Sequence, residues 1–183
     1  TEEGKTGDAA SARKDRADDT VPQTGDESLS GALQPTNEEE IAVMPMAAGP
    51  YTVTSGGGIG TGTLVGEFPS LGEAAAACTD SALQYTITLT ADDPAHGAAA
   101  TILPGISVTL TSSSAAPGTI TTSADGYRHM ELSENSTLIL KNITLNGNGN
   151  TFDGAQNGGI SVGNGAALTV GAGALIQNCY AND

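Results

Sequence analysis

The sequence predicts an all-β fold in which three short strands in each repeat of roughly 30 residues wind into a parallel β-helix. The first observation is a strand-like triplet that recurs once in each repeat, at 108–110, 138–140 and 168–170. The second is a set of apolar positions that keeps the same spacing, Ile102, Leu132 and Val162, with Ala100, Met130 and Ile160 preceding them in the same order. The third is an aromatic content of only 3%, which suits a core of stacked small aliphatic side chains.

A third strand follows these two in each repeat, at 119–121, 143–145 and 175–176, with less regular spacing. Loops of unequal length at one corner would produce that drift. Three strands without an intervening helix do not fit a βαβ unit or a propeller blade. Each strand is therefore expected to pair with its equivalent one repeat later, about 4.8 Å away. Val108, Leu138 and Leu168 would then stack inside, while Thr109 and Thr169 face outwards.

The chain is expected to divide into three regions. Residues 1–40 contain 11 acids and 4 bases with few large apolar groups, so residues 1–48 are predicted to be a disordered acidic tail or linker. Residues 49–84 are predicted to be an N-terminal cap, and residues 85–183 the turns of the β-helix. An uncovered final turn would expose a sheet edge. We therefore expect the coil to be truncated at Asp183, or that end to be covered by self-association.

The predicted cap contains a strand at 51–54, a glycine-rich turn at 56–62 and a short helix at 70–82. The helix begins at Ser70 in a capping box with Glu73, followed by four alanines. Its apolar stripe would run through Leu71, Ala75, Cys78 and Ala82. From 85 onward the apolar residues alternate, which predicts a strand. Asparagine tolerates left-handed backbone, so several asparagines are expected at the corners of the coil: Asn142, Asn146, Asn148, Asn150 and Asn178.

Composition argues against several classes of partner. The 21 acids and 6 bases give a net charge of −15, so binding to nucleic acid through a basic surface is not expected. The sequence has no uninterrupted apolar run of the length that spans a bilayer, about 18 residues or more, so membrane insertion is not expected either. Cys78 and Cys179 are interpreted as two small buried hydrophobic residues and not as a disulfide framework.

The repeats show no pattern that predicts a catalytic residue, a cofactor or a metal site. A catalytic pair would need two carboxylates exactly one repeat apart, and no such pair occurs among Asp92, Asp93, Asp125, Glu131, Glu134 and Asp153. His96, in a predicted turn at 94–97, and His129 have no second ligand at metal-binding spacing. A weak candidate for a small polar cleft remains, with a solvated corner loop as the alternative; its residues are Asp125, Tyr127, Arg128, His129 and Glu131. Calcium at the glycine-rich segment 147–154 is a second weak hypothesis.

Several segments resemble a known family. Residues 138–147 (LILKNITLNG), 158–162 (GGISV) and 176–178 (IQN) resemble turns of pectin-lyase-like right-handed parallel β-helix proteins, and residues 68–74 (FPSLGEA) resemble their capping helix. Within that superfamily the chain is most similar to the repeat region of large cell-surface, adhesin-like proteins of Gram-positive bacteria. The resemblance covers residues 50–183.

The resemblance implies a right-handed coil in a secreted or cell-surface protein. The fold hosts both enzymes and non-catalytic stalks, so function has to be argued separately. The leading hypothesis is a non-catalytic, adhesin-like binding or stalk module whose partner is a glycan or a host or cell-surface protein. The alternatives are a fragment of a polysaccharide lyase or glycoside hydrolase, and a purely structural spacer.

Overall fold

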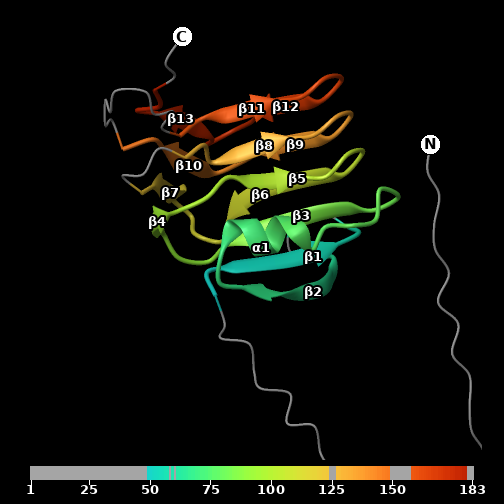
Figure 1. Cartoon of the computed structure of the whole chain (residues 1–183). Helices are drawn as coiled ribbons and strands as arrows, with labels where there is room; N and C mark the ends of the chain where they lie inside the picture. The colour runs from blue at the N-terminus through green and yellow to red at the C-terminus, as the bar shows by residue number, and fades with distance from the viewer. Residues whose placement is uncertain (1–48, 58, 60, 124–126, 149–157, 181–183) are drawn as a thin grey trace, which may run out of the picture. The chain divides into compact units, whose positions relative to one another are not determined.

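A computed structural model describes residues 49–57, 59, 61–123, 127–148 and 158–180 (Figure 1). The chain divides into two units, Thr1–Ile41 and Ala42–Asp183, and every described residue belongs to the second. The predicted acidic tail, residues 1–48, lies outside the described residues. The fold is therefore that of the second unit alone.

The predicted all-β class is confirmed. The described residues form thirteen strands and one helix of six residues, α1. None of their helices is long and apolar enough to cross a membrane. The elements are β1 (Tyr51–Ser55), β2 (Thr63–Phe68), α1 (Leu71–Ala76), β3 (Gln84–Leu89), β4 (Asp93–His96), β5 (Ala100–Ile102), β6 (Ser107–Ser112), β7 (Gly118–Thr122), β8 (Met130–Leu132), β9 (Thr137–Leu140), β10 (Ile143–Asn146), β11 (Ile160–Val162), β12 (Ala167–Val170) and β13 (Leu175–Gln177).

The strands form three sheets that the chain visits in a fixed order. The largest sheet has the order β12-β9-β6-β3-β1-β2, the second β13-β10-β7-β4 and the third β11-β8-β5. From β5 onward, successive strands belong to the third, first and second sheet, and this order occurs three times. Within each sheet, strands from successive passes pair in parallel, and Figure 1 shows them as successive levels.

The predicted register is present residue by residue. Leu138 pairs with Val108 on one side and with Leu168 on the other, and Leu140 is likewise flanked by Leu110 and Val170. Ile102, Leu132 and Val162 also stand in one row. The drifting third strand is aligned as well, because Leu145 pairs with both Ile120 and Ile176. The repeat spacing in the sequence therefore identifies physical neighbours.

These rows of aliphatic side chains make the core. Leu110, Leu138, Leu140 and Leu145 have no solvent exposure, and each fully buried side chain of this size contributes about 1.5–3 kcal/mol. Their alternates, such as Thr109 and Thr144, are only partly buried. Thr169 is exposed, as predicted for this face. The alternation of period two thus separates a dry interior from an outer face.

The N-terminal cap differs from its predicted form in two respects. The glycine cluster is a connection between antiparallel strands, β1 and an additional strand, β2, that the sequence did not indicate. The helix is shorter than predicted: Ser70 caps it as expected, but it ends at Ala76. Further along, where the helix was expected to continue, the Asp80 carboxylate accepts the backbone N–H of Ala82 and stabilises a turn. Ala82 is exposed and does not continue the buried stripe of Leu71, Ala75 and Cys78.

The segment around His96 was predicted to be a turn, and this prediction is wrong. Asp93–His96 forms β4, which pairs in parallel with β7. Pro94 is compatible with this strand because β4 is at the edge of its sheet, where a missing backbone N–H costs no ladder hydrogen bond. The strand orientation turns the His96 side chain into the interior.

Three of the predicted asparagines occupy corners, whereas Asn146 is the last residue of β10 and pairs with Thr121 and Gln177. Asn142, Asn148 and Asn178 all have positive φ values, of 46°, 63° and 53°. Asn142 donates from Nδ2 to Ser112 Oγ at 3.0 Å, and Asn178 donates to Asn146 Oδ1 at 2.9 Å. These bonds join residues roughly one repeat apart, so they tie one level of the structure to the next. Asn150 and the segment 149–154 of the calcium hypothesis lie outside the described residues.

Candidate functional site

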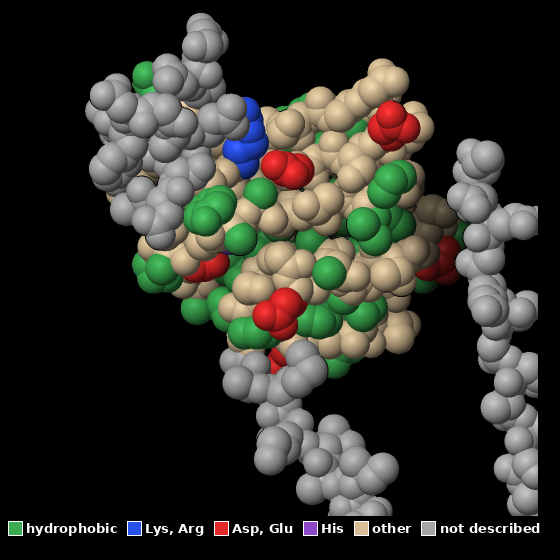
Figure 2. Space-filling view, viewed as in Figure 1, with side chains coloured by type: hydrophobic (Ala, Val, Ile, Leu, Met, Phe, Trp, Pro, Cys, Tyr) green, Lys and Arg blue, Asp and Glu red, His purple; other side chains and the backbone are tan. Residues whose placement is uncertain are grey.

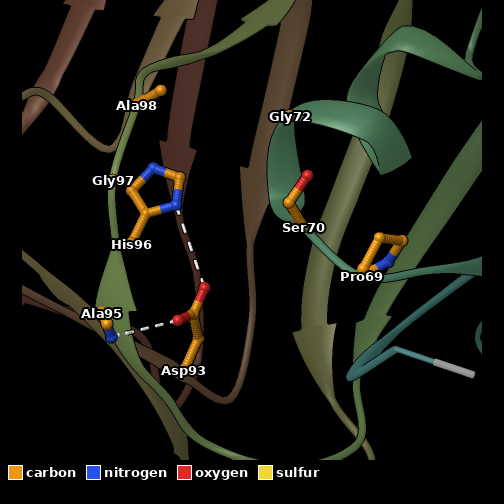
Figure 3. A pocket seen from close by; sticks show the side chains of 8 residues that line it. All are labelled: Pro69, Ser70, Gly72, Asp93, Ala95, His96, Gly97 and Ala98. Atoms are coloured by element: carbon orange, nitrogen blue, oxygen red, sulfur yellow. Dashed lines mark hydrogen bonds and ion pairs between the residues drawn. The ribbon is translucent and has the colours of Figure 1, made fainter. Parts of the chain in front are cut away.

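A hollow of about 160 Å³ lies between the start of α1 and strand β4 (Figure 3). Its lining combines Ser70, the residue that caps α1, with Asp93 and His96 from β4. The remaining lining residues are small or apolar: Pro69, Gly72, Ala95, Gly97 and Ala98. Among the described residues this is where an acid, an imidazole and a hydroxyl line the same hollow. The hollow is therefore the candidate functional site.

Asp93 is the central group of this site. Its Oδ2 accepts a hydrogen bond of 2.6 Å from the hydroxyl of Tyr51 on β1. The same oxygen lies 3.9 Å from Nδ1 of His96, and Oδ1 accepts the backbone N–H of Ala95 at 3.2 Å. The Asp93 side chain is only 17% exposed, so its two hydrogen bonds, from Tyr51 and from Ala95, compensate for lost hydration. The carboxylate thus connects β1 to β4.

Behind Asp93, His96 and His129 form a stacked pair in the interior. Their ring centroids are 5.9 Å apart and their planes differ by 9°. His96 is 4% exposed and His129 is fully buried. Nε2 of His96 donates to the carbonyl of His129 at 3.0 Å, and Nε2 of His129 donates to the carbonyl of Ile120 at 3.1 Å. The pair therefore connects β4, β7 and the start of β8.

The second nitrogen of His129 is also engaged. Nδ1 accepts the backbone N–H of Gly159 at 3.0 Å, which requires that nitrogen to be unprotonated. Glycine is needed beside this ring: a Cβ on Gly158, whose φ is +65°, would lie 2.9 Å from His129 Cε1 and from Cys179 Sγ. Close packing against His129, Cys179 and Gly147 thus explains Gly158, and the positive φ of +75° favours glycine at Gly159.

Burial controls the protonation of these groups. It lowers the pKa of His129 to about 4, with the neighbouring His96 ring contributing in the same direction. Burial also lowers the pKa of His96, while its hydrogen bond to the His129 carbonyl and the charge of Asp93 oppose that change. The pKa of the Tyr51 hydroxyl is raised, first by burial and then by its hydrogen bond to Asp93. At neutral pH the site holds two neutral imidazoles and a neutral phenol.

The group contains the residue types of a hydrolytic triad without the required connections. In such a triad a histidine nitrogen accepts the proton of the serine hydroxyl. Here Nε2 of His96 donates to a carbonyl and Nδ1 faces Asp93. Ser70 Oγ instead accepts the N–H of Glu73 at 3.2 Å and donates to the Glu73 carboxylate at 3.3 Å. The hydrogen bonds of Asp93, His96 and His129 link strands to one another. The Oγ of Ser70 serves only as the N-cap of α1.

The residues of the predicted polar cleft go to different surroundings. His129 is in the interior, whereas Glu131 projects from the outer face of β8, between the buried Met130 and Leu132. Tyr127 is 43% exposed and Arg128 is partly buried. Asp125 lies outside the described residues. The structure therefore separates His129 from Glu131 and brings His129 to His96, a contact that the sequence analysis did not predict.

The two cysteines have different environments. Cys78 is fully buried, as expected, and burial raises the pKa of its thiol to about 12. Cys179 is exposed, so the interpretation of both as buried hydrophobic residues is wrong for this one. Both thiols are free. Within the described ranges no group of three or more His, Cys, Asp or Glu side chains is arranged to hold a metal ion.

Comparisons with known proteins place no further constraint on the site. No protein-family model matches the chain, and neither a curated protein nor a solved structure matches it.

Proposed function

We propose that the chain is a non-catalytic module of a right-handed parallel β-helix, secreted or displayed on a bacterial surface, that binds a neutral glycan through the outer face of its largest sheet. The resemblance of its turns to cell-surface β-helix proteins supports the handedness and the location. The repeated visit to three sheets supports the coil. The binding role depends on one feature of the largest sheet, a grid of threonines.

The threonines stand in register across strands β1, β3 and β6. Thr54, Thr86 and Thr109 form one row. A neighbouring row consists of Thr52, Thr88 and Thr111. All six alternate with core residues such as Val53, Ile87 and Leu110, so they share the face opposite the core. This grid is the observation that carries the proposal.

Exposure and charge decide what this face can accept. Thr52, Thr54, Thr88 and Thr109 are partly exposed, whereas Thr86 and Thr111 are buried. The exposed hydroxyl groups can donate and accept hydrogen bonds. The strand spacing sets Thr52 and Thr88 about 4.8 Å apart, and it sets Thr54 and Thr109, on either side of the buried Thr86, about 10 Å apart. A chain of net charge −15 does not favour an anionic polymer. A neutral polysaccharide, which is itself rich in hydroxyls, is the partner that matches this chemistry.

Figure 2 supports a dispersed arrangement of charge on one side of the molecule. The acidic side chains on that side are scattered among apolar and uncharged polar groups. Glycan-cleaving β-helix enzymes would instead need two carboxylates set across the scissile bond, or several carboxylates with a basic residue. The proposal therefore favours binding over cleavage.

Affinity electrophoresis of the full chain in gels containing galactomannan or xyloglucan tests the binding role. Thr109→Lys places a charge in the grid. The dissociation constant obtained from the retardation should rise at least about tenfold. Thr101→Lys is the matched control, because Thr101 is an exposed outer-face threonine on the third sheet; its retardation should equal that of the wild type. Retardation by neither polysaccharide, or equal effects of the two variants, would contradict the proposal and favour a spacer.

Incubation with polygalacturonate, with and without calcium, tests the enzymatic alternative. The proposal predicts no absorbance from unsaturated uronate and no new reducing ends. Either product would replace the binding role by lyase or hydrolase activity.

A further inference from the structure

Two hydrogen-bond acceptors face each other beside the hollow between α1 and β4. Nε2 of His96 donates to the carbonyl of His129, so it carries the hydrogen of the neutral ring, and Nδ1 can only accept. Oδ2 of Asp93, also an acceptor, lies 3.9 Å from that Nδ1, a separation too long for a hydrogen bond in either protonation state of the ring. Figure 3 shows both side chains at the wall of the hollow. We call these two atoms the Asp93–His96 acceptor pair.

The acceptor pair carries a negative charge and has little contact with solvent. The side chains of Asp93 and His96 are 17% and 3% exposed. The Tyr51 hydroxyl and a backbone N–H donate to the Asp93 carboxylate, but neither of them supplies a positive charge. In the described ranges the Lys and Arg residues are Arg128 and Lys141, and neither lines the hollow. A group that combines N–H donors with a positive charge therefore complements the acceptor pair best.

The geometry of the hollow suits a primary ammonium group on a short alkyl chain. Two hydrogen bonds of about 2.8 Å from one tetrahedral nitrogen reach acceptors that are roughly 4–5 Å apart, close to the separation within the acceptor pair. Beside the pair, the wall contains Pro69, Ala95 and Ala98, whose apolar surface can pack against methylene groups. The volume of about 160 Å³ limits the bound part to a few non-hydrogen atoms.

We propose that the hollow binds a primary ammonium group, which donates to Oδ2 of Asp93 and to Nδ1 of His96 while its alkyl chain packs on the apolar wall. A water molecule offers the same two donors without the charge, so water is the competitor that the ammonium group displaces. A charge-assisted hydrogen bond to the carboxylate favours the ammonium group in this exchange. The site shares no residue with the threonine grid and does not depend on the proposed glycan binding.

Titration of the ¹⁵N-labelled full chain with n-propylammonium chloride, at neutral pH and constant ionic strength, tests the proposal by NMR. Saturable shifts should be confined to amides around the hollow, those of Gly72, Ala95 and Gly97 among them, with a Kd on the order of 1 mM. n-Propanol has the same shape without the charge, and tetramethylammonium has the charge without a donor. Each should bind at least about tenfold more weakly.

Asp93→Asn removes the charge of the acceptor pair and should raise the Kd for n-propylammonium at least about tenfold. Asp92→Asn is the matched control, because it removes the same charge from the next residue. Asp92 is exposed, does not line the hollow and accepts the N–H of Thr119, so this Kd should stay within about twofold of the wild type.

Asp93→Asn could also disturb folding, so its circular dichroism and urea midpoint are compared with those of Asp92→Asn. Ala98→Leu provides a second variant that leaves the acceptor pair unchanged. Ala98 is exposed at the wall of the hollow, so the larger side chain should occupy the hollow and abolish the saturable shifts.

Three results would overturn the proposal. The wild type could show no saturable shift with n-propylammonium up to about 50 mM, which would leave water as the better ligand. n-Propanol could bind as tightly, which would mean that the apolar wall alone selects the ligand. Asp92→Asn and Asp93→Asn could weaken binding equally, which would reduce the effect to overall charge.

The ammonium group could belong to a free amine or to a lysine side chain of another protein. Nα-acetyl-lysine N-methylamide, titrated in the same way, distinguishes these sources. A lower Kd than that of n-propylammonium assigns the site to a lysine side chain, and a higher Kd assigns it to a free amine.

Discussion

His129 stacks on His96 at the point where three strands meet, with 5.9 Å between ring centroids, and it receives the N–H of Gly159 at Nδ1. This single side chain therefore contacts three parts of the chain that are far apart in sequence. Its protonation would remove the acceptor from Gly159 and place a positive charge against a second imidazole. The histidine pair therefore links β4 to β7 and to the start of β8 through contacts that weaken in acid.

Stability should fall as the pH decreases from 6.5 towards 4. The folded pKa of both histidines is lowered from 6.5, to about 4 for His129, so the unfolded chain binds protons first. The contribution is complete above pH 6.5 and is lost as the pH falls through the folded values. For His129 the loss is on the order of 3 kcal/mol. Urea unfolding at neutral pH and at successive pH values down to about 4 measures the loss.

Carboxylates titrate in the same range, so the comparison needs a control. His129→Gln should be less stable than the wild type at neutral pH but should lose less stability on acidification. An identical pH dependence in the two proteins would show that His129 does not contribute to acid sensitivity.

Tyr51→Phe should destabilise the protein by about 1.5–3 kcal/mol. The substitution removes the 2.6 Å hydrogen bond to Asp93 and leaves a partly buried carboxylate with one donor fewer. Tyr127→Phe, at a hydroxyl-bearing residue that is 43% exposed, is the matched control and should change the unfolding free energy by no more than about 0.5 kcal/mol. Equal effects in urea titrations would argue against a stabilising bridge from β1 to β4.

Ser70→Ala should cost about 1 kcal/mol, because the N–H of Glu73 loses its acceptor at the start of α1. Ser70→Asp retains an acceptor and should restore most of that stability. Thermal unfolding followed by circular dichroism compares the three proteins. Failure of the aspartate to improve on alanine would mean that Ser70 acts through something other than the cap.

Leu140→Asp should prevent folding or cost roughly 4 kcal/mol or more, since it places an unpaired carboxylate in a fully buried row. Thr109→Asp, on the opposite face of a paired strand, should change stability by no more than about 1 kcal/mol. Equal melting temperatures for the two variants would contradict the assignment of inner and outer faces.

The sequence predicts the strand rows well because the rows depend on spacing alone. Val108, Leu138 and Leu168 are equally spaced, and stacking them fixes the faces of every strand between. The stacking of His96 on His129 could not be read in this way, because their separation of 33 positions is out of step with the repeat. Their contact depends on the path of the loops that separate β4, β7 and β8.

Two strands were missed for local reasons. Pro94 in β4 and Gly66 in β2 both disfavour strands, yet each lies on an edge strand of its sheet, where the demand on the backbone is lower. Local competition also explains the helix that ended early. Its alanines favour helix as far as Ala76, and the Asp80 turn then competes successfully with further helical hydrogen bonds.

Each strand of the largest sheet from β6 onward lies in register on its equivalent in the next repeat, and the rows of the core depend on this register. Disulfide formation between introduced cysteines tests it most directly, because a bridge requires Cα atoms closer than about 7 Å. In a Cys179→Ser background, Thr109→Cys with Ile139→Cys joins two paired, outward-facing positions, and should oxidise to a crosslink visible in peptide mass spectra. Ser107→Cys with Ile139→Cys is out of register, because Ser107 pairs with Thr137, and should stay reduced. Crosslinking of the offset pair, with none in the paired positions, would contradict the register and with it the assignment of every row in the core.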